Sequence, residues 1–141
     1  MSKELSALTA LQSYLTSTLL LQPRQVMVNE WPDVDKLPKG LSLTILPDRV
    51  EFEQSTISTL QCSLAVKLYI ITKGGVLSTL LADALDALAN ISQAIITDPT
   101  LGKAVLDTVV QTGDIYPALP GQSRAVGIEV DLTISFERNA Q

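Results

Sequence analysis

The stretch that most constrains the fold is residues 74–99, which read GGVLSTLLADALDALANISQAIITDP. Its apolar residues recur with alternating spacings of four and three, which is the rhythm of one side of an α-helix with ~3.6 residues per turn. This stripe comprises Leu77, Leu81, Ala84, Leu88, Ile91 and Ile95. The opposite side is polar and comprises Thr79, Asp83, Asp86, Asn90, Gln93 and Thr97. The pattern predicts an amphipathic helix over residues 77–97, about 30 Å long, which must cover an apolar surface.

The limits of this helix are marked by residue types that begin and end helices. Gly74 and Gly75 interrupt the strand pattern that precedes it, and Ser78 or Thr79 is expected to cap its first turn. Asp98-Pro99 is expected to end it, because a residue before proline avoids helical backbone angles. The helix therefore follows a strand directly, and so short a connection keeps the two elements adjacent.

Strands on both sides of the helix supply the apolar surface that it needs. In residues 126–136 every second residue is apolar, which predicts a strand with one buried face. Residues 62–70 alternate in the same way, and so do residues 41–45 and 50–53. Between the last two lies Pro47-Asp48-Arg49, which predicts a β-hairpin with Asp48 and Arg49 at its tip.

The remaining segments are less strongly patterned. We expect a first helix over residues 2–21, begun by Ser2 and ended by Pro23, then a short strand over residues 26–31 and a loop over 32–40. Residues 54–59 are expected to connect two strands. Residues 100–110 fit a helical turn followed by a strand, and periodicity does not decide between helix and strand there. Residues 111–114 predict a turn, and residues 116–123 predict a loop.

These elements predict one α+β domain spanning residues 1–141. It contains a mixed, mostly antiparallel sheet of four to six strands with two main helices packed on one face. The composition, 46% hydrophobic and 18% charged, is that of a folded chain. The single cysteine cannot form an internal disulfide, which is typical of a reducing compartment. No apolar run reaches ~18 residues without interruption, so we expect no membrane partner.

Residue types that carry out catalysis or bind metals are sparse. Histidine is absent from the sequence, which removes the commonest acid–base group and metal ligand. Cys62 lies on the apolar side of its strand and is expected to be a core thiol. Asp83 and Asp86 are interpreted as solvated carboxylates on a helix surface. Neither a phosphate-binding loop nor a basic patch is present. The sequence therefore predicts no enzyme activity, no cofactor and no metal site.

Two sets of side chains occupy positions that the alternation places outside the core. The acidic set is open to two interpretations, an ordinary solvated face or an acidic surface toward a partner or a lumen; it comprises Glu51, Glu53, Glu129, Asp131 and Glu137. The other set is large and apolar, which is typical of interfaces; it comprises Met27, Trp31, Tyr69 and Ile71. The candidate interface residues are Trp31, Asp48, Arg49, Glu51, Glu53, Tyr69, Lys73 and Arg124.

The order of elements resembles that of the tail terminator proteins of long-tailed phages, the minor tail protein U-like family. The pieces most alike are residues 64–73 running into the Ala- and Leu-rich helix, the Asp98-Pro99-Thr100-Leu101-Gly102 end of that helix, and the final alternating strand. The resemblance covers nearly the whole chain as a layout. It implies a sheet with helices packed on it, assembly into a homohexameric ring, and no catalytic residues.

The resemblance also implies a place for the protein in the virion tail, after assembly in the host cytoplasm. The ring would bind the last ring of the tail tube protein, stop its polymerisation and present a surface to a head-completion or connector protein. DNA would pass through the lumen without specific binding, which fits the formal net charge of −5. Alternatives are a head–tail connector or tail completion protein, a subunit of a phage-derived contractile apparatus, and a small ligand-binding domain.

Overall fold

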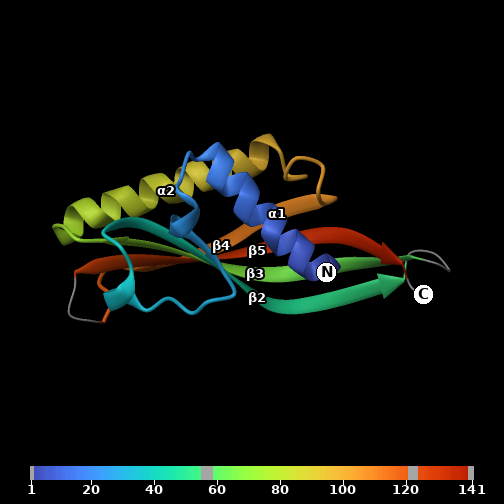
Figure 1. Cartoon of the computed structure of the whole chain (residues 1–141), viewed down its shortest axis with the longest axis horizontal. Coiled ribbons are helices and arrows are strands. Elements are labelled where there is room, and N and C mark those ends of the chain that lie inside the picture. Colours follow the sequence, from blue (N-terminus) through green and yellow to red (C-terminus); the bar gives the residue numbers. More distant parts are fainter. Residues whose placement is uncertain (1, 55–58, 121–123, 140–141) are drawn as a thin grey trace.

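A computed structural model describes residues 2–54, 59–120 and 124–139, and within them a five-stranded sheet carries two α-helices on one face (Figure 1). The elements are α1 (Lys3–Thr18), β1 (Val26–Val28), β2 (Gly40–Gln54), β3 (Thr59–Lys73), α2 (Leu77–Thr97), β4 (Asp107–Tyr116) and β5 (Ala125–Asn139). The strand order is β1-β2-β3-β5-β4. The β1–β2 pair is parallel and the other pairs are antiparallel. The predicted α+β fold with a mixed, mostly antiparallel sheet is confirmed.

The core lies between the helices and the face of the sheet that they cover, which we call the first face. β3 and β5 pair along their whole length, from Thr59 opposite Asn139 to Lys73 opposite Ala125. The alternation in β5 places its six apolar side chains in this core, as predicted. The helices add Ala7, Leu8, Leu11 and Leu15 from α1, and Leu80, Ala84, Ala87, Ile91 and Ile95 from α2.

Helix α2 has the predicted bounds, but its buried side is rotated from the predicted one. Leu80 and Ala87 are buried, whereas Leu77 is exposed and Leu88 is half-buried. Apolar residues cover more than half of this helix, so their spacing alone does not fix its rotation. Buried alanines such as Ala84 and Ala87 allow the helix to lie close to the sheet.

The start of α2 also differs from the prediction. The helix begins without a side-chain cap, after Val76, so the predicted cap at Ser78 or Thr79 is wrong. The chain leaves β3 through Gly74, whose φ of +90° favours glycine, and a Cβ there would lie 2.9 Å from Cγ of Lys39. The predicted end at Asp98 is confirmed.

The predicted hairpin at Pro47-Asp48-Arg49 is wrong, because β2 continues through these residues to Gln54. Asp48 is the extra residue of a β-bulge, and the register with β3 shifts between Pro47 and Arg49. The bulge brings Ile45 and Val50 onto the same face although they are an odd number of residues apart. Proline is tolerated here because this part of β2 lies at an open edge. The predicted connection at residues 54–59 lies mostly outside the described residues.

Three further boundaries differ from the predictions. The predicted turn at residues 111–114 is part of β4, which has a register shift between Val110 and Thr112. The start of α1 is as predicted, because the Oγ of Ser2 accepts the Leu5 N–H at 3.1 Å. The end of α1 is not: the helix ends at Thr18, before Leu20 with a φ of +56°, and Pro23 begins a short 3₁₀-helix. The strand predicted over residues 26–31 is shorter, because Asn29 with a φ of +60° ends it.

Among the described helices, α2 is long and apolar enough to cross a membrane by length and composition, a test that core helices also pass. Its side with Leu80, Ala84 and Ile91 packs on the sheet. Asp83 and Asp86 lie on an exposed side. The helix thus packs one side on the sheet and exposes the other, and the expectation of no membrane partner stays a prediction.

The second face of the sheet is partly covered by residues 29–39, which we call the strap. Val34 and Leu37 of the strap pack on Ile71 and Ala125, forming a small second core. Met27 and Leu119 pack against the same cluster. Ile71 was expected at an exposed position, and this expectation is wrong because the strap, which the alternation could not reveal, covers it.

Candidate functional site

The uncovered part of the second face carries a polar network centred on Lys67 of β3. Its Nζ donates to Oε1 of Glu129 at 2.7 Å and to Oδ1 of Asp131 at 3.0 Å, both on β5. From β4, the Thr112 hydroxyl donates to Oδ2 of Asp131 at 3.0 Å, and the Tyr116 hydroxyl donates to Oε2 of Glu129 at 3.2 Å. Three strands are therefore joined across this face by side-chain hydrogen bonds.

The network shifts the ionisation of its members. Hydrogen bonds to Glu129 and then to Asp131 raise the pKa of Lys67, and the hydrogen bond from Lys67 lowers the pKa of Asp131. The charge of Glu129 raises the pKa of Tyr116, while burial and then Glu129 raise the pKa of Tyr69. Two carboxylates face one ammonium group, so the network is net negative at neutral pH.

An aromatic pocket of about 370 Å³ lies beside this network. Tyr69 and Tyr116 line it, together with Glu129; its other lining residues are Pro32, Val34, Ile71, Leu119, Pro120, Gly127 and Ile128. Trp31 stands next to it, with its ring centroid 6.2 Å from that of Tyr69 and the planes tilted by 47°. Trp31 is 78% exposed, so an aromatic ring on the strap remains available for contact.

The structure brings some of the predicted interface residues together and separates others. Trp31 and Tyr69 meet at the aromatic pocket. Arg49 and Glu51 lie on β2, where Nη2 of Arg49 is 3.1 Å from Oε1 of Glu51 and both side chains are exposed. Asp48, at the bulge, and Glu53, near the end of β2, are also exposed. The candidate interface is thus two regions rather than one.

Lys73 has an internal role that argues against its place in the predicted interface. It is only 8% exposed, and its Nζ donates to the backbone carbonyls of Val34, Asp35 and Leu37 at 2.8, 3.1 and 2.9 Å. A strap far away in sequence buries it. Arg124 is exposed at the start of β5, where its carbonyl accepts the Gly74 N–H at 3.1 Å.

The sequence-based interpretation missed Lys67, Thr112 and Tyr116 as members of this surface. The signal for Lys67 was its place on the same strand face as Tyr69, with the acidic set on β5 as its partners. Thr112 and Tyr116 were assigned to a turn and a loop, so their strand face was not considered. Their pairing opposite Asp131 and Gly127 places them beside the network.

The two edges of the sheet are open in the part of the chain that the structure describes. β4 pairs with β5 on one side, and no strand pairs with its other side. β1 pairs with β2 only at Leu43, Thr44 and Ile45, so the rest of β2 forms the second open edge. Exposed edges with unpaired backbone groups are ready to pair with another chain. Ile115 is an exposed apolar side chain on the edge strand β4.

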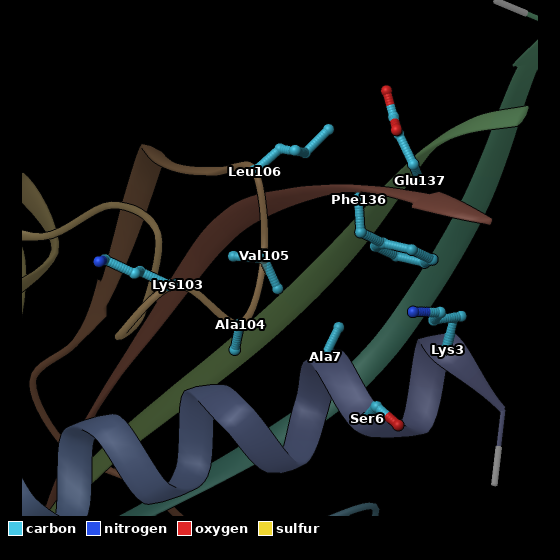
Figure 2. Close-up of a pocket in the computed structure, with 9 residues that line it drawn as sticks. All are labelled: Lys3, Ser6, Ala7, Lys103, Ala104, Val105, Leu106, Phe136 and Glu137. Atoms are coloured by element: carbon cyan, nitrogen blue, oxygen red, sulfur yellow. The ribbon is translucent and has the colours of Figure 1, made fainter. Parts of the chain in front are cut away.

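A second pocket, of about 510 Å³, lies between the first turns of α1, residues 103–106 and the end of β5. Figure 2 shows Phe136 pointing into this space across from Lys3, whereas the ammonium group of Lys103 points away from both. The two lysines do not converge on one point, so the pocket offers no evident anion site.

The described residues contain no group of three or more cysteine and acidic side chains placed to hold a metal ion. Comparison with known proteins adds no family: no protein-family model matches the sequence, and no curated protein is significantly similar to it. What the chain does must therefore be argued from its geometry and from the layout of its elements.

Proposed function

We propose that this protein is a structural virion protein, a tail terminator that forms a ring on the end of a phage tail tube. The ring ends polymerisation of the tube and offers a surface for head attachment. The proposal is supported by the layout that the sequence shares with the tail terminator family. The described sheet, with both helices on one face, is compatible with that layout (Figure 1).

The observation that carries the proposal is the pair of open edges on opposite sides of one sheet. A ring with cyclic symmetry needs two different patches on each subunit, placed so that one meets the other on the next copy. The open part of β2 and the outer side of β4 are two such patches. The exposed Arg49 lies on the first and Ile115 on the second.

The test is electron microscopy of the purified protein, alone and mixed with tail tubes. We expect six-membered rings, or a cap at one end of tubes of fixed length. A protein that never contacts tubes, and whose deletion leaves tail length normal, would contradict the proposal. In the Arg49→Glu variant, tubes should grow beyond their normal length while the monomer stays folded. The matched control is Arg24→Glu, which reverses a charge in the 3₁₀-helix before β1, outside both β2 and β4.

A further inference from the structure

The aromatic pocket has the composition of a site for a cationic side chain. Rings of Trp31, Tyr69 and Tyr116 stand at or beside it, and aromatic faces attract guanidinium and ammonium groups. Its remaining wall is largely apolar, so a guanidinium that enters is partly removed from water, which strengthens this attraction.

The charges around the pocket favour the same ligand. Glu129 lines it, and Asp131 is joined to Glu129 through Lys67, which leaves one negative charge in excess. Asp114, exposed on β4 opposite Glu129, adds another. The charge of Glu129 is also the main cause of the raised pKa of Tyr116. An added cation would complement this charge.

Among the arginines whose side chains the structure describes, Arg49 is the one that lies on the same face of the sheet as the pocket. Its cross-strand partner is Ala65, which shares a face of β3 with Lys67 and Tyr69. Arg24 lies in the 3₁₀-helix before β1, and Arg124 precedes the second-core residue Ala125. The present partner of Arg49 is Glu51, and ion pairs this exposed contribute little. Arg49 is therefore available to another partner.

Arg49 cannot reach the pocket of its own subunit. The residue of β3 in the pocket nearest to Arg49 in register is Tyr69, which lies four residues, or about 13 Å along the strand, from Ala65, the cross-strand partner of Arg49. Arg49 pairs with Ala65 of β3, and Tyr116 lies in register with Ile71 of β3 through Gly127. Ala65 and Ile71 are six residues apart, so Arg49 and Tyr116 are offset along the strand direction by about 20 Å. A neighbouring copy placed edge to edge, with its strands offset by about 20 Å, would bring its Arg49 level with Tyr116.

We infer that Arg49 of one subunit inserts into the aromatic pocket of the next copy of this chain, where Trp31, Tyr69, Tyr116 and Glu129 receive it. The inference rests on the proposed ring and names the contact that closes it. Tyr116 of the edge strand β4 lines the pocket, and Arg49 lies on the opposite open edge. The contact is thus repeated in one direction around the ring.

Crosslinking tests this contact directly. The double variant Arg49→Cys with Tyr116→Cys is treated with a short bis-maleimide, which bridges thiols that are too far apart for a disulfide. Because these substitutions remove part of the contact, the reaction is run at a protein concentration at which electron microscopy shows that the variant forms rings. We expect a ladder of covalent oligomers up to six subunits, because each copy carries one thiol of each kind. The matched control is Arg24→Cys with Tyr116→Cys, for which we expect no ladder. Cys62 is buried in both proteins.

A second readout uses Trp31, the single tryptophan of the chain. Its emission should change when the protein assembles, and Arg49→Met should raise the concentration needed for assembly about tenfold. Arg24→Met should leave it unchanged. Rings with no 49–116 crosslink above the Arg24 control would overturn the inference and leave the proposed function standing. A protein that neither forms rings nor caps tubes would contradict both.

Discussion

The ammonium nitrogen of Lys73 lies 2.9 Å from the carbonyl oxygen of Leu37, and it also donates to the carbonyls of Val34 and Asp35. One side chain at the end of β3 thus satisfies three backbone groups of the strap. Beside it, Leu37 packs on Ile71 and Ala125. The strap carries Trp31 and lines the aromatic pocket through Pro32 and Val34. The position of Trp31 is therefore expected to depend on Lys73.

The Lys73→Met variant tests this dependence. Methionine keeps much of the aliphatic length and removes the three hydrogen bonds, so we expect a loss of about 2–3 kcal/mol in the free energy of unfolding. We also expect faster proteolysis within residues 29–39 and a changed emission of Trp31. The measurements are urea unfolding, limited proteolysis and fluorescence. The control is Lys39→Met, whose side chain is exposed; equal behaviour of the two variants would contradict the role of Lys73.

The regular parts of the fold could be predicted because their periodicity records which side is buried. β5 is the clearest example, since its alternation from Val126 to Phe136 survives intact in the structure. The bulge at Asp48 was missed because proline and aspartate occur in turns and at bulges alike. The sequence does hold a signal for it. Apolar side chains fall on odd positions up to Ile45 and on even positions from Val50, which requires one extra residue in a continuous strand.

The candidate site was less predictable because strand register and the strap bring it together. Trp31 and Tyr69 could be singled out as large side chains at positions expected to be exposed. Their contact depends on the strap, which is fixed by Lys73 from a distant part of the chain. Tyr116 was missed because Pro117 and Pro120 placed it in a predicted loop after a predicted turn at residues 111–114, although β4 continues to Tyr116.

Val130→Asp tests the packing of the helices on the first face. Val130 is fully buried in the main core, so an aspartate there would be a buried charge without a partner and should cost about 3–5 kcal/mol. Thermal unfolding should show a much lower Tm, or no folded protein. Leu85→Asp on α2 is the control, because Leu85 is 40% exposed and the same change should cost less than about 1 kcal/mol. A Val130→Asp protein with an unchanged Tm would refute the packing.

Cys62 should behave as a core side chain. Its side chain is fully buried on β3, and buried thiols react slowly because the thiolate is disfavoured there. We expect a thiol reagent to label the native protein only as fast as it unfolds, and Cys62→Ala to keep ring assembly while losing about 1–2 kcal/mol. Rapid labelling in native conditions, or loss of assembly at unchanged stability, would indicate a functional thiol instead.

Two threonines in the sheet should respond oppositely to the same substitution. Thr44 is fully buried and its Oγ1 has no hydrogen-bond partner among the described residues, so Thr44→Val should leave stability unchanged or raise it by about 1 kcal/mol. Thr72 is also buried, but its hydroxyl donates to the Leu80 carbonyl at 2.7 Å, so Thr72→Val should cost about 1–2 kcal/mol. Urea unfolding of the two variants measures both. Equal losses would mean that Thr44 makes a hydrogen bond after all.

The polar network on the second face should make stability depend on pH in a defined direction. Lys67 lowers the pKa of Asp131 in the folded protein. The contribution of Asp131 to the free energy of unfolding is therefore present above the usual pKa of about 3.9, and it is lost as the pH falls through the lowered pKa. The pKa of Lys67 is raised, so its contribution is complete below about pH 10 and is lost only in more alkaline solution.

Removal of Lys67 should therefore matter at neutral pH and much less in acid. At pH 7, Lys67→Met leaves Glu129 and Asp131 charged side by side, and we expect a loss of about 1 kcal/mol because the group is partly exposed. At pH 3 a larger share of Asp131 is protonated than at pH 7, so the difference in stability between wild type and variant should shrink. Urea unfolding at both pH values measures the difference, and added salt should reduce it at pH 7.

Lys36→Met is the control, since its 3.8 Å pair with Asp33 is highly exposed and should contribute little at either pH. A Lys67→Met defect of the same size at pH 3 and pH 7 would mean that the side chain stabilises the sheet by packing, not by its charge.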